Sequence, residues 1–258
     1  MYKRQDQFYN LSTEYNTDDV LQNGRGTTLS DFLYRGSLDI INGNWEGFHR
    51  IFVNNETTFN DMASKEFKIP SRIRTIISAD FDNDGYDEIF VNNIGQANRL
   101  YKILDNGILK RIPFEIGRLP RGYGTGAAVA DIDNDGVLEL LIAHGESKEQ
   151  PIEIFKANID GTNKFLRIKP LNNFGAPARG ATVTLKSNLR THSKTIDAGS
   201  GYLCQMEPVA HFGIRKNEKN INVSIKWTNG EEVQCNNIET NKTYTFKQND
   251  LNSILANK

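Results

Sequence analysis

Two short acidic segments carry the residues of this chain with the clearest chemical potential. They read ADFDNDGYDEIFVNN, whose first aspartate is Asp80, and ADIDNDGVLELLIAHG, whose first aspartate is Asp131. Both fit the pattern D-x-D-x-D-G, in which alternate carboxylates point toward one centre and the glycine in sixth place permits a sharp turn. Such hard oxygen ligands suit Ca²⁺, and carboxylates this close repel one another unless a cation neutralises them. The segments therefore predict two calcium sites.

The predicted ligands follow the same order in both loops. They are side-chain oxygens at positions one, three, five and nine, and the backbone carbonyl at position seven. In the first loop these are Asp80, Asp82, Asp84, the carbonyl of Tyr86, and Glu88; in the second they are Asp131, Asp133, Asp135, the carbonyl of Val137, and Glu139. A solvated Asp-Asn-Gly turn without metal is the alternative for a single copy, and two copies in register weaken it.

An EF-hand is the main alternative type of calcium loop. It requires a bidentate glutamate at position twelve and helices on both sides. The twelfth residue is Val91 when the count starts at Asp80 and Ile142 when it starts at Asp131. The flanking segments IISA and EIFVNN are strand-like. The sequence therefore excludes an EF-hand and indicates a short loop between two strands.

A third, weaker copy, SDFLYRGSLDIINGN, has Asp31 as its first aspartate. Leu33 and Arg35 occupy its third and fifth positions, so Arg35 would place a cation where a metal should sit. No calcium is expected at this turn. The first aspartates of the three copies are 49 and 51 residues apart (80 − 31 and 131 − 80).

The acidic turns belong to a repeat of about fifty residues, the length of a propeller blade. Each unit combines an apolar run, the turn and a second apolar run, and the unit from Asp80 continues with the alternating segments RLYKIL and LKRIPFEI. Four short strands per unit predict a β-propeller with about three blades between Gly26 and Lys156. Because propellers close with about four to eight blades, the missing N-terminal blades of a full-length chain are expected partners.

The chain divides into unequal parts. Residues 1–159 are predicted to form the partial propeller, 160–248 a small all-β domain, and 249–258 a polar tail. Within 160–248, Asn229-Gly230 is a hairpin signal. The first five residues, MYKRQ, are similar to translated adapter sequence and are treated as a possible sequencing artefact, so the absence of a signal segment says nothing about secretion.

Composition restricts the partners and the compartment. The chain has 258 residues and a net charge of −1, from 31 basic and 32 acidic side chains, which disfavours nucleic acid and anionic membranes. No apolar run reaches the roughly 20 residues that membrane insertion needs. The two cysteines, Cys204 and Cys235, are expected to be buried thiols, with one disulfide as the alternative.

Longer motifs resemble a known family. The acidic loops are similar to the FG-GAP or VCBS repeats of integrin α-chains and secreted bacterial proteins. The stretch Gly124–Ser147 resembles the last blade of the cartilage acidic protein family, and Phe174–Leu185 (FGAPARGATVTL) and Ile196–Ile214 (IDAGSGYLCQMEPVAHFGI) resemble an ASPIC/UnbV domain. The resemblance implies an extracellular, secreted, calcium-binding protein. The chain departs from animal members in having too few blades and no cysteine-rich module at its end.

The favoured function is a non-catalytic binding or adhesion module for an extracellular protein or glycan. The sequence contains no catalytic triad, nucleophile elbow or phosphate-binding glycine loop. A propeller enzyme, active in natural-product cyclisation or on polysaccharides, is the alternative, with Asp39, Glu46, His49 and His144 as its candidate residues. A third possibility is a component of a larger assembly joined through exposed strand edges.

Overall fold

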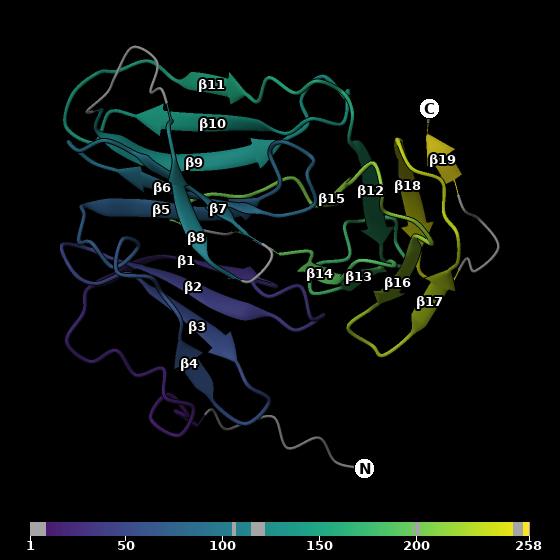
Figure 1. Ribbon diagram of the computed structural model, residues 1–258, viewed down its shortest axis with the longest axis horizontal. Helices are drawn as coiled ribbons and strands as arrows, with labels where there is room; N and C mark the ends of the chain where they lie inside the picture. The colour runs from purple at the N-terminus through teal and green to yellow at the C-terminus, as the bar shows by residue number, and fades with distance from the viewer. Residues whose placement is uncertain are drawn as a thin grey trace.

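The computed structural model describes residues 9–104, 107–114, 122–197, 199 and 202–249, together with the backbone of 255–257. The secondary-structure elements in these residues are all β-strands, and they form five sheets (Figure 1). The predicted all-β class is therefore confirmed. Among the described residues, no helix has the length and apolar character needed to span a bilayer. The expected artefact at residues 1–5 lies outside the described residues.

Three sheets arise from consecutive stretches of the first part of the chain, and each is an antiparallel meander. The strands are β1 (Gly24–Ser30), β2 (Asp39–Asn44), β3 (Arg50–Asn54) and β4 (Phe59–Asp61); β5 (Ile73–Ala79), β6 (Glu88–Asn93), β7 (Arg99–Ile103) and β8 (Leu109–Ile112); and β9 (Gly124–Ala130), β10 (Glu139–His144) and β11 (Glu153–Lys156). Figure 1 shows the three sheets one above another, in a propeller-like arrangement. The first strands are neighbours, with β5 between β1 and β9.

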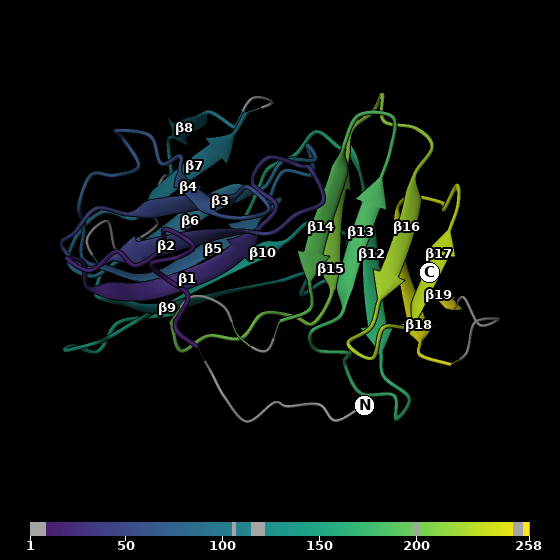
Figure 2. The same ribbon diagram turned by 90° about the horizontal axis from the view of Figure 1, so that it is seen from below.

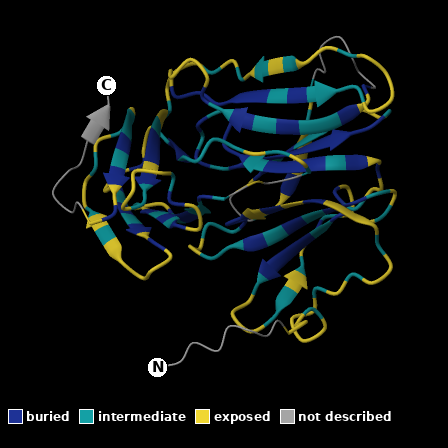
Figure 3. Ribbon diagram, turned by 180° about the vertical axis from the view of Figure 1, so that it is seen from behind, coloured by how far each residue is buried: buried dark blue, intermediate teal, exposed yellow. Residues whose placement is uncertain are grey.

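Strand β6 shows how alternation produces this stacking. Its six residues are all buried because the second sheet has a neighbouring sheet on each face. Ile89 and Val91 pack into the core shared with the first sheet, whereas Phe90 packs into the core shared with the third. Successive side chains of a strand point to opposite faces, so the continuous apolar run IFV can fill both cores at once. The buried inner strands appear dark blue in Figure 3.

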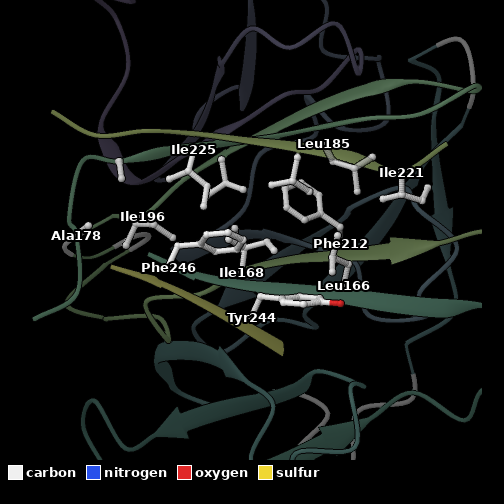
Figure 4. Close-up of a cluster of buried hydrophobic side chains, with 14 of the residues drawn as sticks. Leu166, Ile168, Ala178, Leu185, Ile196, Phe212, Ile221, Ile225, Tyr244 and Phe246 are labelled. Carbon is white, nitrogen blue, oxygen red and sulfur yellow. The ribbon is translucent and has the colours of Figure 1, made fainter. Parts of the chain in front are cut away.

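The remaining two sheets form a β-sandwich. Its strands are β12 (Lys164–Leu171), β13 (Thr182–Lys186), β14 (Thr191–Thr195), β15 (Ala210–Ile214), β16 (Asn222–Lys226), β17 (Glu232–Cys235), β18 (Lys242–Lys247) and β19 (Leu255–Asn257). The sheet orders are β15-β12-β18-β19 and β14-β13-β16-β17. The two sheets enclose a core of their own, with Phe212, Tyr244 and Phe246 on one side and Leu185 and Ile225 on the other (Figure 4).

The architecture differs in detail from the sequence prediction. The three expected blades account for three of the five sheets, and the third of these has three strands within the described residues instead of four. Residues 255–257, which were assigned to the polar tail, pair with β18 as β19. The domain boundaries at 159 and 248 stay predictions.

The sandwich, expected to be a separate domain, lies directly against the ends of the three stacked sheets (Figures 1 and 2). Its β15 is preceded by a segment that follows the edge strand β9. The amide N–H groups of Ala127 and Val129 donate to Cys204 Sγ and Met206 Sδ at 3.2 Å each, and Glu207 N donates to the carbonyl of Val129 at 3.3 Å. This segment therefore covers backbone groups that β9 would otherwise expose at its edge.

Candidate metal centre

The two acidic turns have the same backbone conformation. The first connects β5 to β6 and the second connects β9 to β10, as the strand-like flanks predicted. Position four is an asparagine with positive φ in both turns, Asn83 (57°) and Asn134 (60°), and position six is a glycine, Gly85 (85°) and Gly136 (83°). Asparagine and glycine tolerate the left-handed region better than other residues do. The motif therefore encodes the turn as well as the possible ligands.

The first turn brings three predicted ligands together. Asp80, Asp82 and Glu88 each offer a carboxylate oxygen, and these oxygens lie within 4.8 Å of one another. Asp80 Oδ2 accepts hydrogen bonds from Gly85 N (2.9 Å) and Gly213 N (3.0 Å). Its Oδ1 is buried and has no hydrogen-bond partner among the described residues. A buried carboxylate oxygen in this state is costly unless a cation or donor satisfies it.

Glu88 is arranged in the same way at the end of the first turn. Its Oε2 accepts a hydrogen bond from Phe81 N at 3.0 Å, while its buried Oε1 has no hydrogen-bond partner in the described part of the chain. In both buried acids of this turn, one carboxylate oxygen accepts hydrogen bonds from backbone amides, and the other has no hydrogen-bond partner among the described residues. An all-oxygen set of this kind fits a hard divalent cation.

The second turn repeats the arrangement. Asp131, Asp133 and Glu139 form an equivalent group, again with oxygens within 4.8 Å. Asp131 Oδ2 accepts from Gly136 N at 3.0 Å and lies 2.9 Å from Arg167 Nη1, while its Oδ1 is buried without a hydrogen-bond partner in the described ranges. This group is more open, because the side chain of Asp133 is 60 % exposed.

Two lysines that the sequence interpretation missed enter these groups. Lys102 Nζ lies 2.5 Å from Asp82 Oδ2, 2.7 Å from Asp84 Oδ2 and 3.6 Å from Glu88 Oε1. In the register of the sheet, Lys102 in β7 stands opposite Glu88. Only the pairing of β6 with β7 brings this lysine to the turn, so the acidic motif carries no signal for it.

Lys156 has the same relationship to the second turn. Its Nζ lies 2.8 Å from Asp133 Oδ2, 2.9 Å from Asp135 Oδ2 and 2.6 Å from Glu139 Oε1. Lys156, in β11, also stands directly opposite the last acid of its turn, Glu139. Asp84 and Asp135 contact the same lysines, and their role as metal ligands stays a prediction. The carbonyl oxygens of Tyr86 and Val137 stay predicted ligands.

Burial and like charge determine the electrostatics of the first turn. Burial, reinforced by the nearby carboxylates of Asp87 and Asp84, raises the pKa of Asp80 to about 8. Burial and the charges of Asp80 and Asp82 also raise the pKa of Glu88 well above its ordinary value. In the second turn burial raises the pKa of Asp131, where the opposite charge of Arg167 limits the shift. The metal-free groups thus resist full ionisation, which a bound divalent cation would favour.

The turn at Asp31 keeps the conformation of the other two although it lacks acids at positions three and five. Tyr34 and Gly36 have positive φ at positions four and six (54° and 87°). Asp31 accepts from the amides of Arg35 (2.9 Å) and Gly36 (2.7 Å). Arg35 Nη2 lies 3.6 Å from Asp39 Oδ1, at position nine. A side-chain cation therefore faces the last acid of this turn, where the sequence predicted one.

Comparisons with known proteins follow the same division of the chain. A family model described as an FG-GAP-like repeat matches residues 31–91 and 80–142, and the model "ASPIC and UnbV" matches residues 172–253. Cartilage acidic protein 1 of Xenopus tropicalis is 41 % identical over 262 residues, which is 96 % of this chain and 39 % of that protein. Its Homo sapiens counterpart is 43 % identical over 242 residues, 89 % of this chain and 36 % of that protein.

The chain belongs to the cartilage acidic protein family. It spans about two fifths of the length of these curated relatives. Along this chain the FG-GAP-like repeats precede the ASPIC/UnbV segment.

Solved structures add little to this assignment. The match to a C-terminal fragment of the pilus adhesin SpaC from Lactobacillus rhamnosus GG covers 63 % of this chain and 67 % of that fragment, at 10 % identity and a TM-score of 0.21. The match to a putative cell adhesion protein from Bacteroides ovatus covers 92 % of this chain and 86 % of that protein, at 14 % identity and a TM-score of 0.23. TM-scores this low carry no inference about fold or function.

The four residues considered for an enzyme do not gather at one centre through their contacts with the described residues, although Glu46 and His49 both contact Ser71. Asp39 accepts from the amides of Phe32 and Asn54, Glu46 pairs with Arg72, His49 accepts from Asn44 N and contacts Ser71 Oγ, and His144 Nε2 lies 3.1 Å from Glu153 Oε2. Each contact has an ordinary structural role.

The cysteines are both free thiols, and both are half-buried instead of fully buried. The alternative of a disulfide between Cys204 and Cys235 is therefore wrong for this structure. Cys204 Sγ instead accepts from the edge of β9, which gives the thiol a packing role.

Proposed function

We propose that this chain is part of an extracellular, calcium-binding propeller protein and acts as a non-catalytic binding module for a protein or glycan. One observation carries the calcium part of the proposal. Two acidic turns in register with the FG-GAP-like repeats contain buried aspartate oxygens that have no hydrogen-bond partner within the described residues. Unsatisfied buried carboxylate oxygens in a tight all-oxygen group are what a Ca²⁺ site contains when the ion is absent.

Each ion would be held by the residues at positions one, three, five, seven and nine of its turn. Asp80 and Glu88 would supply the buried ligands of the first site, and Asp131 and Glu139 those of the second. The ion supplies positive charge, and the chain supplies the turn that positions the oxygens. Ca²⁺ accepts six to eight oxygens in flexible geometry, which suits mixed carboxylate and carbonyl ligands. The bound ion would stabilise the turn and leave the outer surfaces of the sheets free for recognition.

The extracellular assignment rests on family membership and on the type of site. Loops built into extracellular modules bind Ca²⁺ with dissociation constants of roughly 10⁻⁴ to 10⁻³ M, which suits an environment with abundant calcium. The relatives bear the name cartilage acidic protein. No contact among the described residues favours the enzyme alternative over the binding module.

Calorimetric titration with CaCl₂ tests the calcium part. The parent chain is expected to bind about two ions. Asp82→Asn and Asp133→Asn are each expected to remove one, since each takes away a charged ligand with little change in volume. Asp160→Asn is the matched control, because Asp160 is exposed and its side chain accepts hydrogen bonds from Thr162 alone among the described residues. A ligand variant that kept the parent's stoichiometry would show that the assignment is wrong at that turn.

The binding part requires a partner assay. The chain, carrying a surface label, is incubated with arrayed matrix proteins and glycosaminoglycan-type glycans in CaCl₂ or in chelator. The proposal expects at least one partner whose capture is lost in chelator and in the Asp82→Asn, Asp133→Asn double variant. Turnover of a glycan, detected as shortened chains, would instead favour the enzyme alternative.

A further inference from the structure

The two lysine ammonium groups occupy equivalent positions in the two acidic turns. Lys102 and Lys156 each contact the acids at positions three, five and nine, and each stands opposite the acid at position nine in the sheet register. The segments that carry them, RLYKI and EIFK, are otherwise different. The repeated element is therefore the position of a cation relative to the turn.

The turn at Asp31 provides an internal comparison. Leu33 stands at its position three in place of an acid, and Arg35 at position five faces Asp39. All three turns thus have the same backbone and a side-chain cation at the last acid. In the Asp31 turn this cation comes from within the loop, and in the turns at Asp80 and Asp131 it comes from the strand after the one that follows the turn. A protein cation at this position is therefore compatible with a folded turn.

The contacts of the lysines overlap with those a calcium ion needs. Ca²⁺ binds oxygens at about 2.3–2.6 Å. The ammonium groups lie 2.5–2.9 Å from carboxylate oxygens of five predicted ligands, Asp82, Asp84, Asp133, Asp135 and Glu139. An ammonium group and a divalent ion cannot share one centre, because they repel each other and compete for the same lone pairs.

We propose that Lys102 and Lys156 are built-in counter-cations that compete with Ca²⁺ for the two turns and set their calcium affinity. This inference rests on the proposed calcium sites. In the metal-free chain each ammonium group offsets the repulsion within its acidic group and keeps the turn folded. When calcium binds, the ammonium group withdraws toward solvent. Its flexible four-carbon stem permits this movement, and the side chains are already 22 % and 31 % exposed.

Lys102→Met and Lys156→Met test the competition directly. Methionine keeps the approximate length of the stem and removes the charge. Each variant is expected to raise the calcium affinity of its own site about ten-fold or more, because a competing charge at contact distance is lost. Each is also expected to lower the thermal midpoint in chelator, because the acids then lack their counter-charge. Lys102→Arg keeps a cation and is expected to bind calcium no more tightly than the parent.

The matched control is Lys110→Met. Lys110 is exposed in β8 and stands directly opposite Lys102 in the sheet, so its removal changes the net charge near the first site equally without removing a contact. It is expected to change the affinity less than about two-fold. The titrations are done by calorimetry at fixed ionic strength, with thermal unfolding in chelator as the second readout.

The outcomes separate this inference from the proposed function. If the parent binds two ions and the Lys→Met variants bind with parental affinity, the counter-cation role is wrong and the calcium sites stand. A gain in Lys102→Arg as large as that in Lys102→Met would also overturn it. If the parent binds no calcium but the variants do, the competition is supported and the proposed calcium binding by the parent falls. Absence of binding in all of them overturns both.

Discussion

The amide N–H of Gly213 in β15 donates a 3.0 Å hydrogen bond to Oδ2 of Asp80, the first acid of the first calcium-type turn. The same relationship recurs at the other turns. Ser193 N donates to Asp31 Oδ2 at 3.0 Å, and Arg167 Nη1 lies 2.9 Å from Asp131 Oδ2. The sandwich thus contacts the first acid of all three turns. At Asp80 and Asp131 the docking of the sandwich therefore uses carboxylates that also belong to the proposed calcium sites.

Removal of calcium is expected to loosen this interface as well as the turns. Binding to the native state alone stabilises it by RT ln(1 + [L]/Kd), about 2.7 kcal/mol when free calcium exceeds Kd a hundredfold. Hydrogen exchange in CaCl₂ and in chelator measures the effect. Loss of protection is expected in the two acidic turns and at Gly213 in β15, with little change in β16 and β17 on the far side of the sandwich. Unchanged exchange at β15 would show that docking is independent of the ion.

Gly213→Ala should destabilise the interface through overpacking. A Cβ built at Gly213 would lie 2.2 Å from Asp80 Oδ2 and 2.5 Å from backbone atoms of Asn83, so the strand or the turn must shift. Such overpacking costs about 1–3 kcal/mol of unfolding free energy. Gly24→Ala is the control, since its nearest neighbour would lie at an ordinary 3.8 Å. Denaturant unfolding gives both values, and equal midpoints for the two variants would contradict the close approach.

Arg167→Met should leave a buried negative charge behind. Arg167 is 2 % exposed and pairs with Asp131 and Glu207. Breaking a buried ion pair from one side costs about 3–5 kcal/mol of unfolding free energy. Because calcium would neutralise Asp131, saturating CaCl₂ is expected to recover part of this loss. The exposed Lys169→Met, on the same strand, is the control. A loss of the same size with and without calcium would argue against an ion at this turn.

His49 should make stability depend on pH. Its Nδ1 accepts from Asn44 N at 3.1 Å, so Nε2 carries the proton toward Ser71 Oγ at 2.9 Å. Burial, assisted by the charge of Arg99, lowers its pKa to about 4. Between about pH 6.5 and 4 the unfolded chain binds a proton at His49 that the folded chain does not bind. Stability is therefore lost as pH falls, by up to about 3 kcal/mol.

His49→Asn isolates this contribution. In the next repeat Asn98 holds the equivalent position and accepts from Asn93 N at 2.7 Å, so asparagine is compatible with the turn. The variant is expected to lose less stability than the parent between pH 6.5 and 4.5. The measurement is urea unfolding at several pH values, compared as slopes. Parallel pH profiles would contradict the lowered pKa of His49.

Local features were predictable from the sequence and register-dependent ones were not. The motif D-x-D-x-D-G specifies both the acids and the positive-φ positions, so the turns at Asp80 and Asp131 could be predicted from adjacent residues. Lys102 reaches its turn only through the pairing of β6 with β7, which no local pattern fixes. The contact of Gly213 with Asp80 joins residues 133 positions apart, and glycine gives no side-chain signal for it.

A crystal structure grown in CaCl₂, with anomalous scattering to identify the ion, tests the central claim most directly. The account predicts one calcium ion at each of the two turns. Its ligands should lie at about 2.3–2.6 Å and should include Asp80 and Glu88 in the first turn and Asp131 and Glu139 in the second. Lys102 and Lys156 should have moved away from the acids. Turns that hold no ion at saturating calcium, with both ammonium groups still among the carboxylates, would contradict it.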